Sequence, residues 1–186
     1  MTQSIATGAK LTAATWEEFV GRLKRDVTGE GYGNDWHYTR DPVFTVEKLV
    51  YDYGVDADYG GEMHVCDDET VYTTPMAYYL EASKATQRAL DECARENGWS
   101  SFASGSDDVQ LEWVEEVGEA RVVGRKGRWE YLNNHFTKDA ADAFISRKKH
   151  DYRDGLRVYV ECSAYCWELN AIREAILSGK LRFVDE

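Results

Sequence analysis

The sequence predicts an α+β fold, an antiparallel sheet of about five strands with three or four helices packed on it. Segments in which apolar and polar residues alternate, as in half-buried strands, stand between segments with helical apolar spacing and capping residues. The chain has 186 residues, of which 43% are hydrophobic, and only 2 are prolines. This composition is sufficient for a packed core, so we expect a single domain over residues 1–186.

The N-terminal part of the chain is expected to supply one helix and one strand. Residues 1–14 are small and polar, which is typical of a loose terminus. The sequence Thr15-Trp16-Glu17-Glu18 has the spacing of a capping box and predicts a helix that ends at about Val27, before a run of glycines. Residues 36–53 are rich in β-branched and aromatic residues and predict a strand, with a short helix over residues 46–51 left open as the alternative.

The middle of the chain is expected to hold the longest helix and a meander of three strands. Thr74 can cap a helix over residues 75–97, which begins with a proline in the favoured first position. Alternation over residues 109–117 predicts a strand with an acidic face. We expect this strand to be followed by strands 119–123 and 128–133.

Residues 129–178 are the best-defined part, with a strand, a helix, a second strand and a second helix. Thr137 is placed to cap the first helix. The turn at Asp154-Gly155 leads into the second strand, residues 156–162, whose alternation places Cys162 on the inner face.

The last helix is expected to follow Ser163, a capping residue, and to end at Gly179, where a C-terminal glycine belongs. Its predicted apolar stripe consists of Trp167, Ile172, Ala175 and Ile176.

Charge is distributed unevenly along the chain. It holds 34 acidic and 22 basic residues, a net charge of −12. Residues 52–119 contain 17 acidic and 3 basic residues, whereas residues 120–157 contain 5 acidic and 10 basic ones. An acidic surface repels nucleic acid and attracts basic protein surfaces. We expect the basic residues of 121–128 and 147–150 to neutralise acidic groups within the fold or across an oligomer.

Two separated segments resemble a family of uncharacterised proteins of tailed phages and prophages. Within residues 136–174 the chain follows the pattern F-T-x-x-A-A-x-A-F-I, then R-V-Y-V, S-A-Y and E-L-x-A-I-R-E. Upstream it has Thr39-Arg40-Asp41-Pro42-Val43-Phe44-Thr45-Val46 and then Gly54-Val55-Asp56-Ala57-Asp58-Tyr59. The resemblance covers about half of the chain, and Cys166-Trp167 stands where the family has Arg-Asn. It implies a phage accessory protein and no settled chemistry.

The sequence carries no local motif of a catalytic or dinucleotide site, so we name no catalytic residue and expect no cofactor. The acidic residues 52–73 are expected to form a solvated loop apart from a short strand over residues 70–73, and a divalent-cation site in the loop stays open. The pairs His64/Cys66 and Cys162/Cys166 also leave zinc open, with buried, metal-free cysteines as the expected state.

Two hypotheses of function follow. The favoured one is a phage-encoded, non-enzymatic inhibitor of a host nucleic-acid-handling or defence complex, comparable to anti-CRISPR proteins that mimic nucleic acid. Its acidic surface would bind a host protein through that protein's basic nucleic-acid-binding surface. The expected partner-binding residues are Glu81, Asp91, Glu92, Glu96, Glu112, Glu115 and Glu116.

The alternative is a small nucleotide-modifying or transferase-type enzyme with a site at His37, Tyr38, Thr39 and Arg40. We expect no direct nucleic-acid contact and no membrane segment, because no apolar run approaches the ~20 residues that a membrane-spanning helix needs. The start of the chain lacks a signal-peptide pattern, which favours the host cytoplasm. A homo-oligomer stays open.

Overall fold

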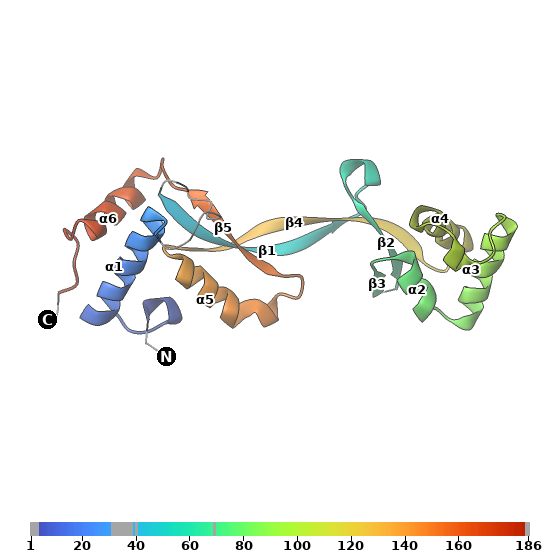
Figure 1. Ribbon diagram of the computed structural model, residues 1–186, viewed down its shortest axis with the longest axis horizontal. Coiled ribbons are helices and arrows are strands. Elements are labelled where there is room, and N and C mark those ends of the chain that lie inside the picture. Colours follow the sequence, from blue (N-terminus) through green and yellow to red (C-terminus); the bar gives the residue numbers. More distant parts are fainter. Residues whose placement is uncertain (1–3, 31–38, 40, 69, 185–186) are drawn as a thin grey trace. The chain divides into compact units, whose positions relative to one another are not determined.

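The structure is a computed structural model that describes residues 4–30, 39, 41–68 and 70–184 (Figure 1). It confirms the predicted α+β class. Five antiparallel strands form one sheet in the order β3-β2-β4-β1-β5. The described ranges contain six α-helices, more than the three or four expected. None of these helices is both long enough and apolar enough to cross a membrane.

The chain, for which the sequence predicted one domain, divides into two compact units. Unit 1 comprises Met1–Val50 with Trp129–Glu186, and unit 2 comprises Tyr51–Arg128. Two long strands, β1 (Pro42–Tyr53) and β4 (Arg121–His135), contribute residues to both units.

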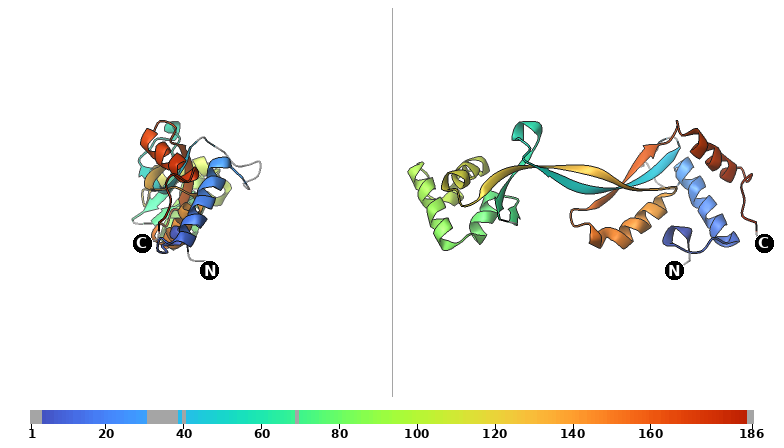
Figure 2. Two further views of the ribbon diagram at one scale, coloured as in Figure 1. Left: turned by 90° about the vertical axis from the view of Figure 1, so that its left-hand side faces the viewer. Right: turned by 180° about the vertical axis from the view of Figure 1, so that it is seen from behind.

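In unit 1, α5 packs along the sheet, and α1 and α6 lie side by side (Figures 1 and 2). β5 pairs antiparallel with β1, so that Phe44 lies opposite Val160. Phe44, Val46 and Ala141 are fully buried where α5 covers these strands. The elements of this unit besides β1 and β4 are η1 (Ile5–Thr7), α1 (Ala13–Thr28), α5 (Lys138–Lys148), η4 (Lys149–Asp151), β5 (Leu156–Cys162) and α6 (Trp167–Leu177).

The N-cap of the first long helix, predicted at Thr15, lies three residues earlier. Thr12 is the N-cap of α1, and the hydroxyl of Thr12 accepts a hydrogen bond from the Thr15 amide at 3.2 Å. The Thr15 hydroxyl accepts a bond from the Thr12 amide at 2.8 Å, so a Thr–Thr pair forms the capping box. The sequence prediction failed because Glu18 satisfied the usual motif, although its carboxylate forms an ion pair with Arg22.

Asp26 ties α1 to the start of α5. Its side chain is fully buried, and Oδ2 accepts a hydrogen bond from the backbone amide of Lys138 at 2.8 Å. Thr137 occupies the N-cap position as predicted, but its hydroxyl makes no capping bond. A carboxylate from a distant helix therefore satisfies the amide, and its charge suits the positive end of the helix dipole.

Arg173 organises the packing of α6. It is 2% exposed and donates hydrogen bonds to the Pro42 carbonyl at 2.9 Å, to Asn170 Oδ1 at 2.9 Å and to Ser163 Oγ at 3.3 Å. Ser163 thus serves this cluster instead of capping α6, whose N-cap residue is Cys166. The capping role predicted for Ser163 is wrong.

The apolar stripe predicted for α6 is also wrong in part. Ile176 is buried, but Trp167 and Ile172 are 75% and 49% exposed. Cys162, predicted on the inner face of β5, is exposed. The helix turns Arg173 toward the sheet, because this guanidinium satisfies a buried carbonyl group of β1.

Unit 2 packs three helices around one apolar cluster. Val65, Leu90, Phe102, Trp113 and Val114 are among its buried members. The elements of unit 2 besides β1 and β4 are η2 (Ala57–Tyr59), β2 (Glu62–Asp67), β3 (Thr70–Tyr72), α2 (Pro75–Glu81), α3 (Lys84–Glu96), η3 (Phe102–Ser104) and α4 (Asp107–Val117). β3 confirms the short strand predicted over residues 70–73. β2 corrects the expectation of a loop before it, since β2 pairs with both β3 and β4.

The helix predicted over residues 75–97 is interrupted after Glu81. Thr74 caps α2 as predicted, but Ser83 begins a new helix by accepting a hydrogen bond from the Thr86 amide at 3.1 Å. Gln87 donates a side-chain bond to the Tyr79 carbonyl at 2.8 Å and so satisfies an acceptor at the end of α2. The break lets the two helices pack against each other and enclose Leu90.

Residues 109–117, predicted as a strand, form the helix α4. Gln110, Trp113 and Val114 are buried at helical spacing, so the alternation seen in the sequence was misleading. The first turn of α4 carries Asp107 and Asp108, whose negative charges interact favourably with the positive end of the helix dipole.

The two short strands predicted at 119–123 and 128–133 are one continuous strand, β4. A Cβ atom on Gly124 would lie 1.6 Å from the Val55 carbonyl oxygen. The Gly124 carbonyl accepts hydrogen bonds from the amides of Gly54 at 2.8 Å and Val55 at 3.2 Å. Glycine therefore permits this close crossing instead of marking a turn.

Candidate functional site

The structure places the predicted partner-binding carboxylates on the three helices of unit 2. Glu81 is the last residue of α2, and the others lie on α3 and α4. Residues 75–119, which contain these helices, include 10 acidic and 3 basic residues. The carboxylates of residues 109–117, expected along a strand, are presented by a helix.

Six of the seven predicted residues are exposed and form no ion pair within the part of the chain that the structure describes. Their charge is thus available to a partner. We call these six the acidic helical surface: Glu81, Glu92, Glu96, Glu112, Glu115 and Glu116.

Asp91 is the exception because it is only partly exposed and both of its carboxylate oxygens accept hydrogen bonds within unit 2. Oδ2 accepts a hydrogen bond from the Tyr79 hydroxyl at 3.0 Å, and Oδ1 accepts one from the Phe102 amide at 3.0 Å. Burial and this bond raise the pKa of Tyr79. Asp91 therefore links α2, α3 and η3, and we assign it a structural role.

Cys93 of α3 forms a hydrogen bond with an acidic residue of α4. Its thiol donates a hydrogen bond to Glu116 Oε2 at 3.3 Å. Burial, this bond and the nearby charges of Glu116 and Glu96 raise the pKa of Cys93 to about 11. The thiol is protonated at neutral pH, which makes it a poor nucleophile and a poor metal ligand.

The acidic helical surface contains rows of like charge. Glu92 and Glu96 stand four residues apart on α3, as do Glu112 and Glu116 on α4, which separates the members of each pair by about 6 Å along the helix axis. Like charges at this spacing destabilise a helix by a few tenths of a kcal/mol per pair. Apart from the bond that Glu116 accepts from Cys93, these rows oppose the helices that carry them, whereas a basic partner would be attracted by them.

The basic residues of β4 are engaged within unit 2. Arg128 Nε lies 2.8 Å from Asp52 Oδ2, and Lys126 donates to the Tyr59 carbonyl at 2.7 Å. The Arg125 guanidinium lies 3.3 Å from the centre of the Tyr51 ring. Of these contacts, the Arg128–Asp52 pair is the predicted neutralisation of an acidic group, whereas Lys126 and Arg125 bind a carbonyl and an aromatic ring.

The cysteine and histidine pairs do not assemble a metal site. His64 is buried on β2 with Nε2 3.7 Å from Glu62, and Cys66 lies two residues further along the strand. Cys162 and Cys166 are both exposed, which corrects the expectation that they are buried. Within the described ranges, no three His, Cys, Asp or Glu side chains could hold a metal ion together.

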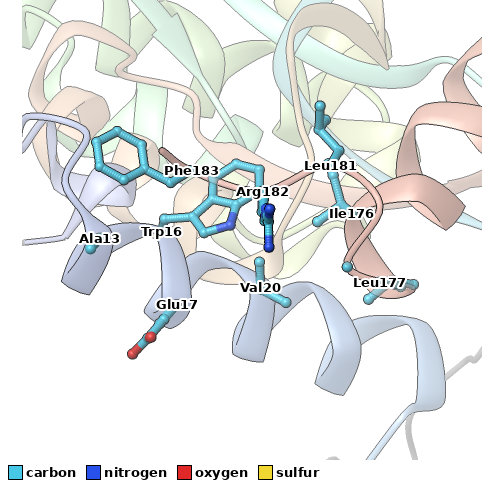
Figure 3. A pocket seen from close by; sticks show the side chains of 10 residues that line it. Ala13, Trp16, Glu17, Val20, Ile176, Leu177, Leu181, Arg182 and Phe183 are labelled. Carbon is cyan, nitrogen blue, oxygen red and sulfur yellow. The ribbon is translucent and has the colours of Figure 1, made fainter. Parts of the chain in front are cut away.

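Unit 1 contains a cleft of about 400 Å³ that the sequence did not indicate (Figure 3). It lies between α1 and the segment that follows α6. Figure 3 shows Trp16 beside Phe183, with Leu181 and Ile176 at the other side and Arg182 between them. The cleft can bury an apolar group, but its lining offers no histidine, cysteine or hydroxyl for catalysis.

The alternative enzyme site cannot be placed. His37, Tyr38 and Arg40 lie outside the described residues, and Thr39 belongs to no helix or strand. The alternative therefore stays a prediction.

Comparisons with protein-family models, curated proteins and solved structures find no match to this chain. The functional interpretation rests on the charge and geometry of the residues described above.

Proposed function

We propose that this protein is a non-enzymatic binding protein whose acidic helical surface engages the basic, nucleic-acid-binding surface of a partner protein. The partner class is a nucleic-acid-handling or defence complex of a host cell, and the protein inhibits it by occupying the place of nucleic acid. The resemblance of two segments to phage accessory proteins motivates this choice of partner class.

One observation carries the proposal: six exposed carboxylates on α2, α3 and α4 have no ion-pairing partner among the residues described. A polynucleotide strand also presents negative charges at short, regular intervals. Exposed rows of carboxylates on helices that a common core holds in place can match several cationic groups of one groove at once.

Direct binding of nucleic acid is disfavoured by the same charges. Unit 2 carries 17 acidic and 7 basic residues. Three of the basic residues of β4, Arg125, Lys126 and Arg128, are engaged in contacts within the unit. Long-range electrostatic forces would therefore repel a phosphate backbone from this unit.

The test is an affinity capture from nuclease-treated host lysate, followed by mass spectrometry. Bound proteins are washed at about 0.1 M and about 1 M salt, since the Debye length falls from about 10 Å to about 3 Å over this range. A parallel sample is eluted with duplex DNA. We expect nucleic-acid-binding proteins that are released by high salt and by DNA.

Two matched variants distinguish an effect of the acidic helical surface from an effect of the protein's net charge. Glu112→Gln/Glu115→Gln/Glu116→Gln removes three charges from α4 and should abolish the capture. The control Glu161→Gln/Glu168→Gln/Glu174→Gln removes three exposed charges from unit 1 and should leave it unchanged. Equal capture by both variants, or capture that DNA does not compete with, contradicts the proposal.

A further inference from the structure

A second cavity of unit 1, of about 340 Å³, combines apolar walls with cationic and polar side chains. Its walls come from η1, α1, the end of β4 and α5. Its size and composition are typical of sites for small molecules. The residues that matter here are Phe19, Phe136, Ala140, His135, Arg22 and Arg147.

The apolar part of the cavity is built by aromatic rings from distant segments. Phe19 of α1 and Phe136, which follows β4, meet edge to face with ring centres 6.3 Å apart. Ile5 of η1 and Ala140 of α5 also line the space. Because Ala140 has a short side chain, room is left beside the rings for a compact apolar group.

The two arginines that line the cavity differ in their partners. Arg22 is neutralised, since it pairs with Glu18 and lies 3.2 Å from Asp139. Arg147 is exposed and forms no ion pair with any residue the structure describes. Its described polar contact is a long hydrogen bond of 3.4 Å to the Ala6 carbonyl. Arg147 thus brings a positive charge that the cavity does not balance.

His135 is a further polar side chain in the lining of this cavity. Burial, and then the charge of Arg147, lower its pKa, so that the imidazole is neutral at neutral pH. Its Nε2 atom is buried and has no hydrogen-bond partner among the residues that the structure describes. His135 also borders a neighbouring cavity of about 250 Å³ with Val43 and Leu169. The ring is therefore a sensitive reporter of anything that enters either space.

We propose that this cavity binds a small organic carboxylate with a compact apolar body. The planar fork of Arg147 suits the two oxygens of a carboxylate, and one unbalanced arginine suits a single negative charge. Phe19, Phe136 and Ala140 receive the apolar body. The site lies in unit 1 and is independent of the acidic helical surface of unit 2.

The test uses benzoate as the probe and the imidazole Cε1–H signal of His135 in NMR as the readout. Benzoate should shift this signal in a saturable manner. Benzyl alcohol, which has the same ring and no charge, should bind at least about tenfold more weakly because it lacks the charge-assisted hydrogen bonds. Phenyl phosphate, a dianion at neutral pH, should not bind more tightly than benzoate.

Two variants test the two halves of the site. Arg147→Gln removes the charge and should weaken benzoate binding about tenfold or more. Ala140→Leu fills the space beside the rings and should abolish binding while Arg147 is retained. Arg182→Gln, which changes an exposed arginine of the other cleft, should bind benzoate like the unmodified protein. Circular dichroism checks that each variant is folded.

The proposal is overturned if the His135 signal shows no saturable change with benzoate. It is also overturned if folded Arg147→Gln binds benzoate as tightly as the Arg182→Gln control does, or if benzyl alcohol binds as well as benzoate.

Discussion

Asp26 and Lys138 are 112 positions apart in the chain, yet the Asp26 carboxylate accepts a hydrogen bond from the Lys138 backbone amide at 2.8 Å. The other carboxylate oxygen accepts two bonds from Arg25, of 3.0 and 2.9 Å. Arg25 in turn donates to Asp139 in the first turn of α5. One fully buried carboxylate thus fixes the start of α5 on α1.

Replacing Asp26 by alanine should therefore destabilise unit 1. The change leaves the partly buried Lys138 amide without its acceptor and removes a charge from the helix N-terminus, which together cost about 2–4 kcal/mol. Urea unfolding followed by circular dichroism measures this. Asp142→Ala is the control, because it removes only the partly exposed pair with the Lys138 side chain and should cost less than about 1 kcal/mol. Equal effects of the two changes would refute the role of Asp26.

Gly124→Ala should be strongly destabilising, whereas Gly21→Ala should be stabilising. The new Cβ at position 124 would lie 1.6 Å from the Val55 carbonyl oxygen, so the chain crossing at Gly54 and Val55 must open. Gly21 lies within α1 with nothing within 4 Å of its Cβ position, so alanine should add about 0.5–1 kcal/mol. Thermal unfolding of both variants should show melting-temperature shifts of opposite sign.

Cys93 should react with iodoacetamide far more slowly than Cys166 at pH 8. The pKa of Cys93 is raised to about 11, mainly by burial, whereas Cys166 is exposed. Because the pKa of Cys93 in the folded state exceeds its ordinary value of 9.0, its contribution to stability is complete below pH 9 and is lost as the pH rises toward 11. Time-resolved mass spectrometry of labelled peptides checks the rates, and similar rates for both thiols would exclude a raised pKa.

His135 should titrate below its ordinary pKa of 6.5, and Arg147→Gln should raise that pKa. Burial opposes the charged imidazolium, and the charge of Arg147 opposes it further. Since the folded-state pKa is lowered, the contribution of His135 to stability is complete above pH 6.5 and decreases as the pH falls below it. An NMR pH titration of the imidazole signal gives both values. An unchanged pKa in the variant would show that Arg147 does not act on the ring.

The sequence by itself determined the α+β class and the elements whose signals are local. β5 has the predicted bounds of residues 156–162, and Gly179 follows α6 in the left-handed conformation typical of helix ends. Alternation and terminal glycines reflect backbone geometry, which depends little on distant contacts. The sequence also located the acidic carboxylates of residues 81–116, because charge can be read directly from composition.

Only the tertiary structure decided how ambiguous segments fold and which polar groups are buried. Residues 109–117 alternate like a strand, but burial of Trp113 and Val114 in the core of unit 2 selects a helix. Ser163 has the chemistry of a cap, yet Arg173 recruits it because the Pro42 carbonyl requires a buried donor. Long-range hydrogen bonds and core packing outweigh local preferences of a few tenths of a kcal/mol, and a single sequence does not reveal these partners.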